Sequence, residues 1–235
     1  LSARSFQHLS ANDYVWGQAT YDNGRRYDVR WNETSDFLLV YPYVMADGRG
    51  GDLKYEQYAL NGGYARRLHQ WHLGFSLGYR ALSEYRQNDP RPNNTVADLS
   101  GSFSLGYATG THAIAASVKA GKYKQTNELV YFNDLGAQME YHLTGLGNDF
   151  ARFSGNNNNT FYKGYRIGGS IGTTPISGKG LSGSISYQYM DLEKIISDLN
   201  RLPLNHIGEH TWRGELVWQQ AIYGDRKSTR LNSSH

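Results

Sequence analysis

The sequence predicts an all-β protein: an antiparallel up-and-down transmembrane β-barrel of about 8–10 strands, truncated, with long loops at one rim and a short loop helix. Segments in which apolar and small polar residues alternate with a period of two recur along the chain. The connections between these segments are alternately short and long. Glycine and aromatic residues are abundant, with 27 Gly, 19 Tyr and 5 Trp, and the chain has no cysteine, so no disulfide framework is expected.

The segment from Gln70 to Leu82, QWHLGFSLGYRAL, shows the alternation most clearly. Its odd positions include Trp71, Phe75 and Tyr79, and its even positions carry histidine, glycine, serine and arginine. Similar segments give eight predicted strands, at 13–22, 53–67, 70–86, 95–107, 112–124, 159–172, 181–191 and 208–222.

The connections sort into two kinds, as expected for turns at one rim and loops at the other. Those near 68–69, 108–111 and 173–180 are short, and those near 23–52, 87–94, 125–158 and 192–207 are mostly much longer. A hairpin of LVYF and AQMEYHL inside 125–158 would add a pair of strands and preserve the alternation.

One segment, DLEKIISDLN at 191–200, has the pattern of a helix. Asp191 can cap its start, the apolar residues from Leu192 to Leu199 share one face, and Pro203 follows. We expect a loop helix over the mouth of the barrel; the alternative is a continuous strand with a polar end.

Alternation alone does not say which face meets water, because a soluble barrel puts its apolar face inward and a membrane barrel turns it toward lipid. Glycine, serine and charge on the other face suit a wet or crowded interior. Tyr and Trp gather near strand ends, where an aromatic girdle would lie. Many strands are also long enough to cross a bilayer when tilted. We therefore favour the membrane barrel, with the lipid bilayer as its partner.

The tail Asp225–His235, DRKSTRLNSSH, matches none of the preceding patterns and resembles a translated short-read sequencing adapter. We interpret it as an artefact, which implies that the gene continued past Gly224 and that the chain is truncated. The expected organisation is an N-terminal flank (1–12), a partial barrel (13–224) and the tail (225–235). The tail accounts for +2 of the formal net charge of +3, so the charge gives no reason to expect a nucleic-acid partner.

Several longer motifs resemble an uncharacterised outer-membrane β-barrel family of Bacteroidota. They are RWNETSDF (30–37), YPYVMADG (41–48), DPRP (89–92), YHLTGLGNDFARFSG (141–155) and SDLNRLP (197–203). The resemblance covers nearly all of 6–222. It implies an outer-membrane location and a barrel larger than this chain, and it supplies no activity and no catalytic residue.

The charged residues on the polar faces of the predicted strands are the lumen-facing candidates: His72, Arg80, Asp98, Arg166, Arg213 and Glu215. They could set the selectivity of a channel. The favoured alternative is an internal salt-bridge and hydrogen-bond network, because buried charges persist only when paired.

The loop candidates for partner contact are Arg91, Asp149, Arg152 and Asn157. Arg91 lies in DPRP, which could also be a stiff turn, and Asn157 lies in GNNNNTF, which could hold a glycan or cation but is more typical of a solvated loop tip. HIGEH at 206–210 matches the zinc-protease pattern H-x-x-E-H. A helix there is opposed by Gly208, so we predict no metal and no cofactor.

The leading functional hypothesis is a channel or transporter for small polar solutes in the bacterial outer membrane, not an enzyme. One alternative is a membrane anchor whose extracellular loops bind a protein or glycan. The other is an outer-membrane enzyme with a His–carboxylate pair at the rim. The sequence gives neither the substrate nor the oligomeric state.

Overall fold

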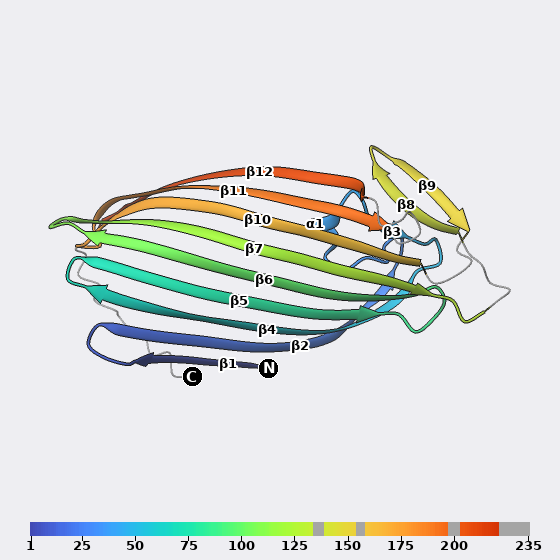
Figure 1. The fold of residues 1–235 in the computed structure, drawn as a ribbon, viewed down its shortest axis with the longest axis horizontal. Coiled ribbons are helices and arrows are strands. Elements are labelled where there is room, and N and C mark those ends of the chain that lie inside the picture. Colours follow the sequence, from blue (N-terminus) through green and yellow to red (C-terminus); the bar gives the residue numbers. More distant parts are fainter. Residues whose placement is uncertain (134–138, 154–157, 197–202, 221–235) are drawn as a thin grey trace, which may run out of the picture.

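A computed structural model describes residues 1–133, 139–153, 158–196 and 203–220. Nine strands form one antiparallel sheet in the order β1-β2-β4-β5-β6-β7-β10-β11-β12, which is an up-and-down meander (Figure 1). Their bounds are β1 Ser2–His8, β2 Asp13–Val29, β4 Gly51–Leu68, β5 Trp71–Tyr85, β6 Arg91–Ala108, β7 His112–Val130, β10 Asn158–Pro175, β11 Gly180–Ile196 and β12 Pro203–Gln219. Within the described residues, β1 and β12 each pair with one neighbour only.

All eight predicted strands are confirmed, and most of them extend further toward the long connections than the alternation indicated. The ninth strand is β1, which lies in the segment assigned to an N-terminal flank. The predicted LVYF–AQMEYHL hairpin is wrong. The strand β8 (Met139–Gly145) pairs with β9 (Asn148–Phe153) and β3 (Met45–Ala46) in a separate three-stranded sheet, because its partners come from the neighbouring loop segments rather than from LVYF.

The predicted helix at 191–200 is also wrong for its described part, and the strand alternative holds. Residues up to Ile196 continue β11, and 197–200 lie outside the described residues. β10 and β12 pair with this segment on both edges, and these ladders override its helical pattern. Met190, Leu192 and Lys194 are buried, so the segment alternates with the period of a strand. The short helix is instead α1, Phe37–Val40, in the β2–β4 connection.

The outer face of the sheet carries exposed apolar side chains from strand to strand. Phe75, Ile167 and Leu181 are each at least half exposed. Aromatic side chains gather toward both ends of this apolar surface. Trp71 and Tyr107 are paired on the side of the short turns, with ring centroids 4.8 Å apart. Tyr165 and Tyr189 lie 6.1 Å apart nearer the long loops. In the part of the chain that is described, no helix is long and apolar enough to cross a membrane.

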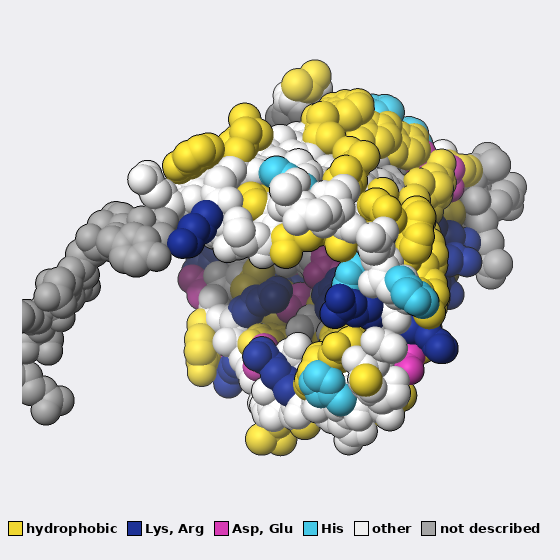
Figure 2. Space-filling view, turned by 90° about the vertical axis from the view of Figure 1, so that its left-hand side faces the viewer, with side chains coloured by type: hydrophobic (Ala, Val, Ile, Leu, Met, Phe, Trp, Pro, Cys, Tyr) yellow, Lys and Arg dark blue, Asp and Glu magenta, His cyan; other side chains and the backbone are white. Residues whose placement is uncertain are grey.

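The opposite face, here called the interior face, carries small and polar side chains. Hydroxyl pairs bridge adjacent strands: Ser76 Oγ lies 2.7 Å from Ser102 Oγ, and Ser117 Oγ lies 2.7 Å from Ser170 Oγ. Viewed from the end with the short turns, the molecule is hollow, with charged side chains inside and hydrophobic side chains outside (Figure 2). The predicted direction of the two faces is therefore the one observed.

The core lies at the other end of the sheet, where the β2–β4 connection folds over the interior face. We call residues 30–50 the inserted loop; it contains α1 and β3. Val40 and Val44 of this loop form a buried cluster with side chains of the surrounding strands: Leu82, Val96, Tyr123, Tyr162 and Leu192. The fold therefore has a hollow half near the short turns and a packed half near the long loops.

Candidate functional site

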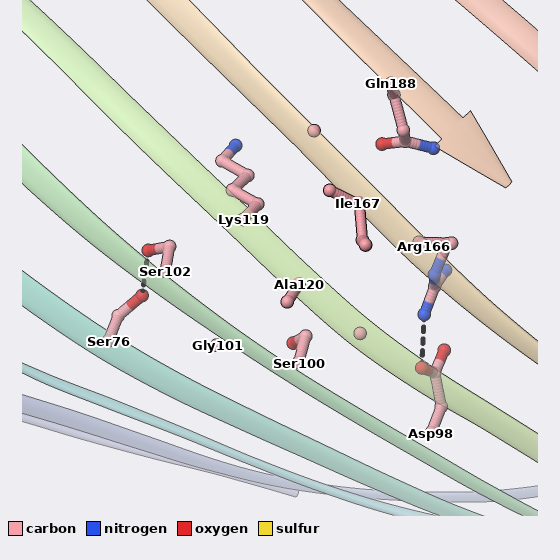
Figure 3. Close-up of a pocket in the computed structure, with 12 residues that line it drawn as sticks. Ser76, Asp98, Ser100, Gly101, Ser102, Lys119, Ala120, Arg166, Ile167 and Gln188 are labelled. Atoms are coloured by element: carbon pink, nitrogen blue, oxygen red, sulfur yellow. Dashed lines mark hydrogen bonds and ion pairs between the residues drawn. The ribbon is translucent and has the colours of Figure 1, made fainter.

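Three of the six predicted lumen-facing residues meet in one charged network on the interior face. Asp98 on β6 pairs with Arg166 on β10, as Figure 3 shows, and lies 3.8 Å from Arg80 on β5. Arg80 in turn donates to both oxygens of Asp36 in the inserted loop, at 3.0 and 2.6 Å. The Tyr123 hydroxyl donates to Asp36 at 2.9 Å. The network ties the middle of the sheet to the inserted loop.

The other three candidates share the interior face but lie apart from this network. His72 pairs in register with Gly106 near the short turns, and Arg213 and Glu215 oppose Ser186 and Ser184 from β12. Among the described residues, none of the three has a carboxylate or basic partner within 4 Å. The predicted internal pairing thus occurs for Arg80, Asp98 and Arg166 only.

Two cavities open on the interior face in the hollow half. One of about 440 Å³ is lined by Ser102, Asp98, Arg166 and Gln188, and a second of about 340 Å³ is lined by Ser170, Glu209 and Arg213. Lys119 on β7 lines both of them and is exposed. Figure 3 shows its side chain with no dashed contact to the other labelled residues. The arrangement places an exposed cation between two polar cavities.

The inserted loop is held at its other end by a buried ionic cluster. The Arg86 guanidinium lies 2.6 Å from Asp47 and 3.2 Å from Glu33, and all three side chains are almost completely buried. Arg86 Nε also donates to the Pro90 carbonyl at 2.8 Å. Burial raises the pKa of the Glu33 carboxyl well above its ordinary value; the Asp47 carboxylate raises this pKa further, and Arg86 opposes the rise. The Arg86 guanidinium therefore pairs with two neighbouring carboxyl groups, those of Glu33 and Asp47.

Further hydrogen bonds to several strands complete the attachment. The amides of Asn94 on β6 and Asn127 on β7 both donate to the Glu33 carbonyl at 2.8 Å. Ser35 donates to Glu84 at 2.9 Å, and the Tyr162 hydroxyl donates to the Tyr43 carbonyl at 2.8 Å. These hydrogen bonds therefore fix the inserted loop in one position, through partners on strands that are far apart in sequence.

The sequence patterns did not indicate that the inserted loop is part of this site. Glu33, Asp36 and Asp47 lie inside RWNETSDF and YPYVMADG, the motifs that carried the family resemblance. Their acidic groups, set among apolar residues in a long connection, were the available signal. Periodicity gives no sign that a loop folds inward, so the partners Arg80 and Arg86 could not be assigned to it.

The predicted loop residues are scattered. Arg91 begins β6, pairs with Asp89 at 2.7 Å and stacks on Phe132, with 3.9 Å between its guanidinium carbon and the ring centroid. The Phe132 and Asn133 backbone amides also donate to Asp89. Although burial raises the pKa of Asp89, these amides and Arg91 lower it below its ordinary value. Two further candidates, Asp149 and Arg152, lie on β9, and the Arg152 side chain and Asn157 lie outside the described parts.

HIGEH lies within the strand β12, not on a helix. Strand alternation puts Glu209 on the interior face and both histidines on the outer face. His206 Nε2 lies 2.6 Å from Asp191, and the Tyr189 hydroxyl donates to the same carboxylate at 3.1 Å. No group of three or more metal-ligating side chains is found in the described residues. The residues paired in register with His206 and Asp191 are Glu193, Gly208 and Tyr165, and none of these is a serine that the pair could activate as a nucleophile.

Comparison with solved structures finds a match to the ferric citrate transporter FecA in its unliganded form, with a TM-score of 0.45 and 9% identity. The match covers 92% of this chain and 32% of FecA, so the chain spans about a third of that protein. No curated protein matches the chain. A model of a protein family of unknown function, DUF6850, matches residues 1–235. The chain therefore belongs to the DUF6850 family.

Proposed function

We propose that this chain forms the wall of a bacterial outer-membrane β-barrel through which small polar solutes pass. The support for membrane insertion is the outer face. Along β5 the exposed apolar side chains extend from Trp71 to Tyr79, which is eight residue steps. At about 3.4 Å per residue this is roughly 27 Å along the strand, close to the apolar band of about 25 Å in outer-membrane barrels once strand tilt is allowed for. A continuous apolar surface of this extent is unfavourable in water.

The interior face is the observation that carries the proposal of passage. Serine residues, with their small side chains, and glycine residues, with none, leave space beside Lys119, and the charged groups there line cavities instead of a packed core. A polar conduit needs hydrogen-bonding groups and fixed charges along its wall, and both are present. In this proposal the protein is a conduit and not an enzyme.

A second candidate function is that of an anchor for loops that bind an extracellular partner. The inserted loop favours it, because its buried residues, including Val40 and Met45, fill the loop end of the interior face. In the first proposal the inserted loop narrows the conduit, and in the second the loop closes the conduit completely. The two differ in whether ions cross the folded protein.

The experiment is single-channel recording of the intact protein in planar bilayers. We expect conductance steps, and a lower preference for anions in Lys119→Gln, because that lysine lines both cavities. The control is Lys54→Gln, whose amine contacts Gln87 at 3.1 Å at the loop rim, away from both cavities. Absence of conductance steps from correctly folded protein would exclude passage and leave the anchor.

A further inference from the structure

Three lysines form a basic cluster on the outer face of the sheet. Lys122 and Lys124 lie on β7, and Lys163 lies on β10, directly opposite Lys124 in the antiparallel register. All three side chains are exposed. Because Lys122 and Lys124 are two residues apart on one strand, they point to the same side. We call these three residues the lysine cluster.

The amines of the lysine cluster form no ion pair with a carboxylate within the described protein. None of the three amines has a carboxylate within 4 Å among the described residues. Glu193 on β11 opposes Lys163 in register without forming an ion pair, and the nearby Asp191 is occupied by His206 and Tyr189. Lys124 and Lys163 are like charges directly across a strand pair, which destabilises a sheet, and an anion placed between them would offset this repulsion.

The lysine cluster lies at the border of the apolar surface. On the side of the short turns, the next outward residues of β7 and β10 are Ala120, Val118 and Ile167, and the latter two are more than half exposed. Lys122 shares its register row with Leu99 and Tyr165. A lysine stem can lie along such a surface while its amine extends to the polar boundary, where lipid phosphates are found.

We propose that Lys122, Lys124 and Lys163 bind the phosphate groups of an anionic lipid in the leaflet on the side of the long loops. The inference rests on the proposed membrane insertion. A lipid is favoured over a soluble anion because the basic cluster is continuous with the apolar surface, so headgroup and acyl chains are bound together. Tyr165 opposes Lys122 in register, and tyrosine is enriched at membrane–water interfaces.

The test reconstitutes the intact protein in phosphatidylcholine vesicles that contain a minor fraction of diphosphorylated lipid A. After mild detergent extraction, native mass spectrometry counts the lipid A retained by each protein. We expect the affinity for lipid A to fall about fivefold for each lysine changed to glutamine, and about a hundredfold in the triple variant. The matched control is Lys119→Gln, on the same strand but on the interior face, which should retain lipid A like the unmodified protein.

Two further arms identify the source of the phosphate. Dephosphorylated lipid A should be retained equally by the unmodified protein and the triple variant, and millimolar inorganic phosphate should not displace lipid A. Displacement by inorganic phosphate, or equal lipid A retention in the triple variant, would overturn the inference. Protease protection in pure phosphatidylcholine vesicles reports insertion separately, so a protein that inserts but does not depend on these lysines refutes the lipid site alone.

Discussion

The contact between Asp36 and Arg80 is the clearest point at which one side chain controls the inserted loop. The Asp36 carboxylate accepts two hydrogen bonds from Arg80 and one from Tyr123. Asp36 has a φ of 50°, a left-handed conformation that asparagine also tolerates. The change Asp36→Asn therefore removes the negative charge while keeping the shape and the backbone preference.

The expected cost follows from the exposure of the pair. Two unit charges about 4 Å apart at an effective dielectric constant of about 20 interact by roughly 4 kcal/mol. The side chains of Arg80 and Asp36 are 25% and 19% exposed, and Arg80 keeps Asp98 at 3.8 Å, so the loss is smaller. The asparagine oxygen also keeps one hydrogen bond. We expect the inserted loop to lose about 2 kcal/mol of local stability, an approximately 30-fold rise in the population of its released form.

Hydrogen exchange of the intact protein measures this directly. The backbone amides of Leu39 and Tyr43, which donate within the inserted loop, should exchange about 30-fold faster in Asp36→Asn, while strand amides remain unchanged. Asp28→Asn is the matched control, since the Asp28 side chain is 71% exposed. The reasoning fails if the loop amides keep their rates, or if Asp28→Asn accelerates them equally.

Three other predictions test the two faces and the packed half. A depth-sensitive spin label at Phe75 should report hydrocarbon and one at Ser76 should not, because Phe75 is half exposed on the outer face and Ser76 bonds to Ser102 inside; the reverse result would contradict the membrane orientation. Because the pKa of Glu33 is raised above 4.5 in the folded state, the folded protein holds a proton that the unfolded chain releases, and its stability should fall as pH rises from about 4.5 toward the folded pKa. Thermal unfolding of Glu33→Gln, measured across this pH range, should lack this fall. A variant with the same pH profile as the unmodified protein would contradict the assignment to Glu33. Gly164→Ala should destabilise the protein by about 1–3 kcal/mol, because a Cβ there meets the Asp191 carbonyl, whereas Gly214→Ala, with open space, should be nearly neutral; equal unfolding temperatures would show that the backbone adapts.

The sheet was predictable because every strand places apolar side chains on one face and small or polar side chains on the other. The alternation around Phe75 and Ser76 assigns both faces, and the antiparallel neighbours Phe103 and Ser102 repeat it in register. The strand ends were underestimated near the long loops, since apolar residues such as Leu192 turn inward there to contact the inserted loop. The same burial explains why a helix was predicted at 191–200: apolar residues occur on both faces of that strand end, which imitates a helical pattern.

The candidate site was only half predictable. The polarity of Arg80, Asp98 and Arg166 placed them on the interior face, and their opposite signs indicated pairing. The partner that connects them to the inserted loop, Asp36, comes from a segment without periodicity, at a sequence distance of 44 residues from Arg80. Contacts of this kind depend on the path of a loop in three dimensions, which local patterns do not encode.

The way in which the inserted loop is held bears on the choice between conduit and anchor. Apolar contacts such as those of Val40 would suffice to fill the loop end, and replacing buried ion pairs by apolar residues is often neutral or stabilising. The loop is nevertheless held by ion pairs, from Asp36 to Arg80 and from Glu33 and Asp47 to Arg86. Each of these ion pairs requires a specific partner. Ionic contacts give one defined position, and they weaken when a competing charged solute reaches them, whereas an apolar plug does not respond to such a solute. The charged attachment of the loop is therefore the feature expected of a constriction that responds to a charged solute, and it favours the conduit over the anchor.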